Sequence, residues 1–379
     1  MRLIFFLALF VPTSSFTQTL TNNSTISITK SWYQEPNGYT YPMNIYVPSG
    51  AVPNGGFPVC ILLHGNGGQG AGILAQFQNV LDCHALIAPS GYMNSWNISE
   101  EGSDAPDVEM MEDLINNLQT YSNINPNKIR VLGFSNGSAL ANRVLIENSN
   151  TGVDIICGMV SQLSEANYHN GNFYSPSGQT SASLPYCGYD VVTVPITGRK
   201  YLSICNFNDP LIPYNGGPSV GVTFLDAQLA TYIVAQSQGF NGSQMFGPGN
   251  DVGTSTVALE EFSYINGQVV HLKGDANHGT NPTQLNYVKD FFTVDCSSTG
   301  YQTNNDQKIM AFPNPVHASL NISVGNHISE IEFKLFDARG ILLETSSATN
   351  IDLSQYANGI YFLRIFYDEK IEEIKVLKN

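Results

Sequence analysis

Between residues 28 and 295, short apolar runs alternate with segments of helical periodicity, and no other feature restricts the fold so strongly. Several of the apolar runs are continuous, as in strands covered on both faces. Strands that alternate with helices predict an α/β fold with a doubly wound, mostly parallel sheet. The predicted strands cover residues 58–65, 85–90, 129–135, 154–161, 200–207 and 269–275, and the predicted helices cover 109–121, 138–148, 224–237 and 283–292.

Two kinds of segment depart from this alternation inside the predicted first domain, residues 28–295. Residues 31–34 and 41–48 look like strands, and we expect them to open the domain as an antiparallel pair. Residues 161–199 and 240–256 are long excursions rich in glycine and serine. Excursions of this kind in such a fold are usually surface loops over the functional site.

The pattern changes near the C-terminus. Residues 296–306 are polar and predict a linker. Residues 307–379 contain short alternating strands separated by turn residues, with no helical spacing, and predict a small all-β sandwich. We therefore expect two domains, with the chemistry in the first.

The N-terminus has the pattern of a signal peptide, residues 1–17. Arg2 gives a basic start, a short apolar block follows, and small residues precede the expected cut after Thr17. The alternative is a buried first strand. No later stretch reaches the roughly 18 apolar residues of a membrane-spanning helix. The net charge of −15 argues against a nucleic-acid or anionic-membrane partner. The sequence therefore favours a secreted or surface protein that is exported through the periplasm.

The six cysteines fall into two groups. Three lie in predicted strands, where a free thiol packs as a small apolar residue: Cys60, Cys157 and Cys205. The other three are better candidates for one disulfide, whose pairing the sequence leaves open: Cys83, Cys187 and Cys296.

Residues 133–137 read GFSNG and lie between a predicted strand and a predicted helix. In a Gly-x-Ser-x-Gly turn the serine is held in a strained conformation with its Oγ above the sheet edge. The amides at the start of the following helix favour developing negative charge at the same place. The alternative is a serine that only caps the helix. The flanking elements favour Ser135 as a nucleophile.

A serine nucleophile needs a histidine base, and the base must follow it in this fold. His278 lies in GDANHGTNP, directly after the last predicted strand, where the base is expected. His271 falls inside that strand and His169 lies in the long excursion, whereas His317 and His327 belong to the second domain. We therefore predict His278 as the base.

The base needs an orienting carboxylate. Asp209 lies on the turn after the predicted strand 200–207. Asp190 and Asp226 are placed less well, and Asp275 would have to bend back along its own loop. The alternative for Asp209 is an Asx turn before Pro210, a role that an aspartate can combine with catalysis. We predict Asp209 as the acid.

The transition state also needs donors for the oxyanion. The amide of Asn136, directly after the serine, supplies one. The second is expected from HGNGG, as the amide of Asn66 or Gly67. A phosphate loop is the weaker interpretation because neither of its glycine spacings is present. His64 is expected beside this hole as a hydrogen-bonding residue of the substrate site rather than as a base.

Taken together, NIYVPSG, LLHGNGG, APSGYMNSWN, GFSNGSALA and NDPLIPYNGG resemble an α/β-hydrolase of the polyhydroxybutyrate depolymerase and feruloyl esterase group, related to carbohydrate esterase family 1. The resemblance implies the same triad, and it places Trp96 near the substrate cleft, with a core aromatic as the alternative. The chain departs from the family pattern at CNFN, before the acid, and at NHGTNP. These departures affect the substrate more than the reaction class.

The C-terminal region has a resemblance of its own. FPNP, LFDARG, ANGIYFLRI and the final KVLKN look like the C-terminal sorting domain of the type IX secretion system of Bacteroidetes. The resemblance implies that this domain is an export address read by the secretion machinery. The alternative is an ordinary β-sandwich binding module.

These features favour a secreted serine carboxylic ester hydrolase that works through an acyl-enzyme without a metal or organic cofactor. The resemblance implies feruloyl or acetyl esters of polysaccharides as substrates, with a polyester such as polyhydroxyalkanoate as the alternative. A peptidase of the same fold is a weaker option. A catalytically silent glycan-binding surface protein is the rival from another class.

Overall fold

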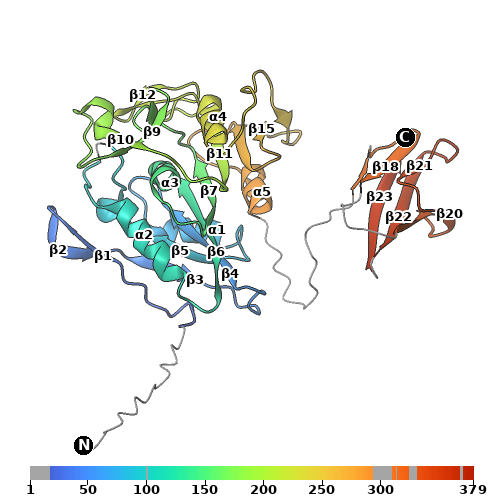
Figure 1. The fold of residues 1–379 in the computed structure, drawn as a ribbon, viewed down its shortest axis with the longest axis horizontal. Coiled ribbons are helices and arrows are strands. Elements are labelled where there is room, and N and C mark those ends of the chain that lie inside the picture. The colour runs from blue at the N-terminus through green and yellow to red at the C-terminus, as the bar shows by residue number, and fades with distance from the viewer. Residues whose placement is uncertain (1–17, 100, 293–309, 313, 324–330, 368–369) are drawn as a thin grey trace, which may run out of the picture. The chain divides into compact units, whose positions relative to one another are not determined.

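The computed structural model describes residues 18–292 except 100, together with 310–312, 314–323, 331–367 and 370–379. The described residues form two compact units, one before and one after the stretch 293–309 (Figure 1). The predicted signal peptide, the predicted linker, Cys296 and His327 lie outside the described residues.

The first unit is built on a nine-stranded sheet with the order β14-β15-β16-β11-β7-β6-β4-β5-β3. Its six inner strands pair in parallel, and the remaining pairings, at the two edges, are antiparallel. All six predicted strands are present, and the predicted α/β fold with a mostly parallel sheet is confirmed. The inner strands are β4 (Phe57–Leu63), β5 (Ala85–Pro89), β6 (Ile124–Phe134), β7 (Val153–Met159), β11 (Lys200–Asn206) and β16 (Val269–Gly274), and the edge strands are β3 (Met43–Tyr46), β14 (Asn250–Asp251) and β15 (Glu260–Tyr264).

Helices cover both faces of this sheet. Alternate residues of a strand point to opposite faces, so Ile61 of β4 packs into one core and Leu62 into the other. Helices α2, α3 and α4 contribute to the first core, and α1 and α5 to the second. The bounds are α1 (Gly70–Phe77), α2 (Asp107–Leu118), α3 (Asn136–Glu147), α4 (Ala227–Ser237) and α5 (Pro282–Phe291).

Helix α1 was not predicted, because two of the first three residues of its sequence GAGILAQF are glycines, which are poor helix formers. It forms because Ile73 and Phe77 pack against the sheet. Gly70 is required by space: a Cβ there would lie 2.1 Å from the carbonyl oxygen of Ala88. Tertiary packing therefore overrides weak local propensity.

The predicted pairing of residues 31–34 with 41–48 is wrong. Strand β1 (Thr29–Trp32) pairs with β2 (Glu35–Thr40) across a tight turn, so the first hairpin closes locally. Strand β3 instead lies antiparallel to β5. Its Met43 and Ile45 pack against the main core, which a separate hairpin would have left exposed.

The long excursion at 161–199 is more ordered than the predicted surface loop. It contains a three-stranded antiparallel sheet of β8 (Tyr168–His169), β9 (Asn172–Pro176) and β10 (Tyr189–Thr193). A second insertion is the hairpin of β12 (Gly217–Ser219) and β13 (Val222–Phe224). Figure 1 shows β9, β10 and β12 gathered at one end of the unit.

The second unit is all β, as predicted. Buried residues of one sheet, such as Leu320 and Ile351, pack with Leu335, Leu363 and Val376 of the other in a single core. The three-stranded sheet has the order β17-β18-β21 and the four-stranded sheet β20-β19-β22-β23. The bounds are β17 (Met310–Phe312), β18 (Ser319–Ser323), β19 (Ile331–Asp337), β20 (Leu342–Ser346), β21 (Asn350–Asp352), β22 (Gly359–Tyr367) and β23 (Lys370–Lys378).

The cysteines of the first unit agree with the two predicted groups except for Cys187, a disulfide candidate in the sequence that is a buried thiol in the structure. Cys60, Cys157 and Cys205 are buried and carry free thiols. Cys83 takes part in a disulfide. In the described part of the chain, no helix combines the length and the apolar character that crossing a membrane requires.

Candidate active site

Ser135 sits in the turn between β6 and α3 with φ 53° and ψ −118°. This left-handed φ is strained for a residue with a Cβ, and such strain persists only where the surroundings fix the backbone. The Ser135 amide donates to the carbonyl of Met159 at 2.8 Å, which ties the turn to the neighbouring strand β7. The serine therefore stands at the carboxyl end of the central strands.

The two glycines of GFSNG are needed for space rather than for backbone freedom. A Cβ on Gly133 would lie 2.0 Å from the carbonyl oxygen of Gly137, and a Cβ on Gly137 would lie 2.2 Å from that of Leu63. Neither glycine has a positive φ. The turn is therefore compressed between the strand and the helix, and this compression holds Ser135 above the sheet.

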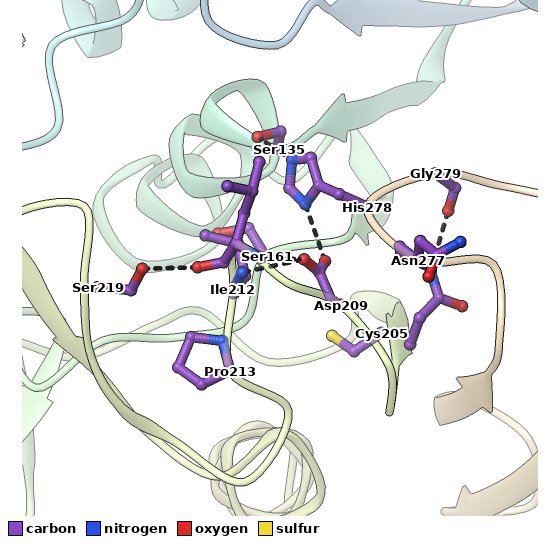
Figure 2. A network of polar contacts seen from close by, with 12 residues as sticks. Ser135, Ser161, Cys205, Asp209, Ile212, Pro213, Ser219, Asn277, His278 and Gly279 are labelled. Carbon is purple, nitrogen blue, oxygen red and sulfur yellow. Dashed lines mark hydrogen bonds and ion pairs between the residues drawn. The ribbon is translucent and has the colours of Figure 1, made fainter.

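His278 bridges Ser135 and Asp209 (Figure 2). Its Nε2 lies 2.8 Å from Ser135 Oγ, and its Nδ1 lies 2.8 Å from Asp209 Oδ2. A carboxylate only accepts, so the neutral imidazole carries its proton on Nδ1 and leaves Nε2 to accept from the serine hydroxyl. The three side chains, from three different loops, thus form one hydrogen-bonded chain.

Asp209 is fixed on both of its oxygens. While Oδ2 faces the imidazole, Oδ1 accepts from the amides of Leu211 at 2.8 Å and Ile212 at 3.0 Å. This is the Asx turn that the sequence offered as an alternative, and it coexists with the contact to His278. The side chain of Asp209 is only 2% exposed, against 17% for His278, so the carboxylate is shielded from water.

Two asparagines that the sequence did not single out hold the histidine loop against the acid loop. Buried Asn206 donates from Nδ2 to the carbonyls of Asn277 at 2.7 Å and Gly279 at 3.0 Å, and its Oδ1 accepts from Gln284 at 2.7 Å. Asn208 donates to the carbonyl of Asp275 and accepts from the amide of Asn277. Both lie in CNFN, where the chain departs from the family pattern.

The other candidate acids and bases are engaged elsewhere. His271 is buried in β16 beside Tyr214, at 2.9 Å from its hydroxyl, and burial lowers its pKa to about 3. His169 stacks between two tyrosines. Asp190 accepts from Ser177, and Asp226 caps α4. His317 belongs to the second unit.

The candidate oxyanion donors differ in their availability. The amide of Asn136 lies in the first turn of α3, where a helix has no preceding carbonyl to receive it. The amide of Asn66 has no hydrogen-bond acceptor among the described residues. The amide of Gly67 instead donates to the carbonyl of Asn94 at 2.8 Å. Of the two predicted alternatives for the second donor, Asn66 is therefore the one whose amide meets no acceptor within the described ranges.

The structure corrects the substrate-contact role predicted for Trp96 and His64. Trp96 is fully buried, and its Nε1 donates to the carbonyl of His64 at 2.8 Å. His64 is 2% exposed; its Nδ1 faces the carbonyl of Gly65 and its Nε2 accepts from the amide of Gly91. Burial lowers the pKa of His64, which favours this neutral form. Neither side chain lines the cavity; they position the loops that do.

Asn136 and Glu101 hold the loop that follows Trp96. The Asn136 side chain accepts from the amide of Trp96 at 2.7 Å and donates to Glu101 at 3.0 Å. Glu101 in turn accepts from the amides of Ile98 and Ser99. Glu101 was not predicted, since nothing local in the sequence marks a loop carboxylate as a partner of a residue 35 positions away.

A cavity of about 500 Å³ opens over Ser135. One group of its lining residues is apolar and includes Ile98, Phe134 and Phe224. A second group is polar and includes Glu101 and Asn167. The site can therefore take an apolar group next to the serine together with a few directed hydrogen bonds. No group of three or more histidine, cysteine or acidic side chains within the described ranges is arranged to hold a metal ion.

Several solved structures are similar to this chain in fold. A carboxylesterase from Bacillus cereus is 12% identical, covers 66% of this chain and 93% of its own, and gives a TM-score of 0.42. An acetyl xylan esterase from Aspergillus awamori gives the same four values. A phospholipase/carboxylesterase from Dyadobacter fermentans is 18% identical, covers 53% of this chain and 85% of its own, and gives a TM-score of 0.31.

The sequence comparisons concern the two units differently. The comparison with curated proteins finds no match. A family model described as the secretion system C-terminal sorting domain matches residues 310–379, which is nearly the whole of the second unit. The resemblance predicted for this end of the chain is therefore confirmed.

Proposed function

We propose that the first unit is a serine carboxylic ester hydrolase that works through an acyl-enzyme. The observation that carries this proposal is the hydrogen-bonded chain from Ser135 through His278 to Asp209, at 2.8 Å for each contact. It stands at the carboxyl end of the central strands, on a strained turn and at the mouth of a cavity. A serine in this setting has both a base and room for an acyl group.

In the proposed mechanism, Ser135 Oγ attacks the ester carbonyl while its proton passes to His278 Nε2. Asp209 accepts from Nδ1–H and stabilises the imidazolium that forms. The imidazolium then protonates the departing alcohol, and an acyl group remains on Ser135. A water molecule, deprotonated by the same imidazole, attacks the acyl carbon and releases the carboxylic acid, which restores the serine hydroxyl.

The negative charge that develops on the carbonyl oxygen needs donors in place before the reaction. We assign the amides of Asn136 and Asn66, which have no acceptor in the described part of the chain and whose residues line the cavity. The amide of Gly67 is excluded from this role by its bond to Asn94. The start of α3 adds a favourable dipole at the same position.

For the substrate we propose feruloyl or acetyl esters of polysaccharides. The apolar side of the cavity suits an aromatic or small acyl group, and its polar side suits a hydroxylated alcohol. The competing substrate is a polyester such as polyhydroxyalkanoate, favoured by the exposed Leu211 and Val220 at the mouth. Export by the type IX secretion machinery is supported by the match at residues 310–379.

The test of the activity is hydrolysis of p-nitrophenyl acetate and butyrate by the full chain and by Ser135→Ala. We expect the variant to lose at least about 10³-fold in kcat, because it removes the nucleophile itself. Equal rates in both proteins would overturn the assignment and would favour the silent glycan-binding protein. Release of ferulate or acetate from xylan, measured against hydrolysis of hydroxybutyrate oligomers, then decides between the two ester classes.

A further inference from the structure

A second cavity of about 500 Å³ lies beside the one that holds Ser135. Val220 and Val222 of the β12–β13 hairpin line both cavities, so the hairpin separates them. Val220, at the tip, is 58% exposed and has a left-handed φ of 41°. The two cavities are therefore neighbours across a single protruding edge.

The wall between the cavities is one layer of extended chain. Strand β13 pairs with residues 163–165: the amide of Glu165 donates to the carbonyl of Thr223 at 2.8 Å, and that of Leu225 to Leu163 at 3.0 Å. Successive side chains of an extended chain point to opposite sides. Accordingly Ser164 and Phe224 line the serine cavity, whereas Glu165 and Thr223 line the second one.

An aromatic stack forms part of the second cavity. Tyr186 lines it and is 42% exposed, and one face of its ring is covered by His169 at a centroid distance of 3.6 Å. The other face of His169 stacks on Tyr174 at 3.8 Å. His169 Nδ1 donates to the carbonyl of Glu165 at 2.8 Å, which fixes the middle ring. Tyr186 is therefore held as a rigid platform although it is an exposed residue.

Three polar residues line the second cavity among apolar ones such as Leu184 and Pro218, and one of the three is linked to the catalytic acid. The three are Glu165, Ser219 and Thr223, which belong to the same lining as Tyr186. Ser219 Oγ donates to the carbonyl of Leu211 at 2.6 Å, and the amide of Leu211 donates to Asp209. The hairpin is therefore fastened to the loop that orients the base.

We propose that the second cavity binds a neutral glycosyl unit of the polymer whose ester enters the serine cavity, an inference that rests on the proposed function. A pyranose has an apolar face that stacks on an aromatic ring and a rim of hydroxyls that needs polar partners. Glu165 accepts from such hydroxyls and repels the carboxylate of an acidic sugar. The substrate passes over the tip of the β12–β13 hairpin at Val220 and occupies both cavities. A polymeric ester therefore gains contacts that a small ester lacks.

The experiment compares kcat/KM for acetylated xylo-oligosaccharide and for p-nitrophenyl acetate in the full chain. We expect Tyr186→Ala to lose about tenfold on the oligosaccharide and to stay within about twofold on the small ester. Tyr186→Phe should retain the oligosaccharide activity, since the ring remains. Phe246→Ala is the matched control, because Phe246 is 79% exposed and outside both cavities. An unchanged ratio between the two substrates in Tyr186→Ala would overturn the proposal.

A binding measurement separates this proposal from the proposed function. Ser135→Ala is titrated calorimetrically with xylohexaose, cellohexaose, mannohexaose and a galacturonate oligomer. We expect saturable binding of at least one neutral oligomer and no binding of the galacturonate oligomer. Combining Ser135→Ala with Tyr186→Ala or Thr223→Val should abolish the binding of the neutral oligomer. If small esters are hydrolysed equally by wild type and Ser135→Ala, the function fails, but the titration still decides on the glycan site. Binding of none of the neutral oligomers, or a Tyr186→Ala defect confined to hydroxybutyrate oligomers, would refute the site.

Discussion

The loops at the ends of the central strands and the insertions above them use side chains in opposite ways. In the strand-end loops, the side chains of Asp209 and Asn206 are almost fully enclosed, and both oxygens of Asp209 accept hydrogen bonds. In the insertions, Val194 is 83% exposed and Val220 58%. Geometry for chemistry is fixed by many simultaneous contacts, whereas a surface for recognition keeps side chains available. Changes in the first region should therefore affect every ester, and changes in the second should affect only some.

The largest expected effect is that of Asp209→Asn. The amide side chain keeps the shape but no longer favours the Nδ1–H tautomer or the imidazolium, so His278 would lose its proposed function as a base. We expect kcat to fall about 10³-fold or more on both p-nitrophenyl acetate and xylan ester, measured by initial rates. Asp190→Asn, in the insertion, is the matched control and should stay within about threefold. A comparable loss in both variants would erase the distinction between the two regions.

Gly137→Ala tests how tightly the strand-end turn is packed, compared with the insertion. Its Cβ would lie 2.2 Å from the carbonyl oxygen of Leu63 in the buried sheet, and backbone cannot move away cheaply. We expect a loss of about 3 kcal/mol in the free energy of unfolding, or failure to fold. Urea unfolding followed by tryptophan fluorescence measures it, since Trp32 and Trp96 both lie in the first unit. Gly171→Ala in the insertion, where no atom lies within 4 Å of the added Cβ but φ is +78°, should cost no more than about 1 kcal/mol.

Much of the fold could be predicted because its signals lie in neighbouring residues of the sequence. The continuous apolar strands and the periodic helices made the sheet predictable, because burial on both faces leaves a pattern in consecutive residues. The GFSNG turn placed Ser135 for the same reason: its spacing is local. Asp209 and His278 could be selected because each follows a predicted strand, and parallel strands end at one edge.

The missed features depend on contacts between distant segments. Trp96 matched a family position near the cleft, yet its burial is decided by the loop of His64, 32 residues earlier. The sheet in the excursion was missed because its strands are short and one of them, β10, has only exposed or half-buried residues after Tyr189. Asn206 and Asn208 carried no local signal beyond a departure from the family pattern.

Asn206→Ala is the next prediction in order of size. The change removes three hydrogen bonds of a buried side chain, two of them to the carbonyls that flank His278. We expect kcat to fall about 10- to 100-fold, with a smaller change in KM, because the base loses its position before the substrate loses contacts. The exposed Asn172→Ala in β9 is the control. An unchanged kcat with a lowered melting temperature would make Asn206 a stabilising residue only.

The last prediction concerns the free energy of unfolding at low pH, and it depends on the buried His271 of β16. His271 is fully buried and neutral, with its pKa lowered to about 3 from 6.5 by burial and by nearby Lys273. The unfolded chain takes up a proton as the pH falls through 6.5, whereas the folded chain does not until about pH 3. Stability is therefore fully present above pH 6.5 and is lost as the pH falls, by about 1.4 kcal/mol per pH unit for this one group.

Between pH 6 and 4, His271→Gln should lower the slope of unfolding free energy against pH by the contribution of one proton, about 1.4 kcal/mol per pH unit. The glutamine retains polar atoms for Tyr214 and Ser203 but cannot take up the proton that the unfolded wild type binds. Urea unfolding at three pH values, followed by tryptophan fluorescence, measures the slope. His317→Gln in the second unit should leave it unchanged, since both tryptophans report on the first unit. Parallel slopes for wild type and His271→Gln would mean that the acid sensitivity arises elsewhere, for instance at His84, whose pKa is also lowered to about 3 by burial and by Arg130.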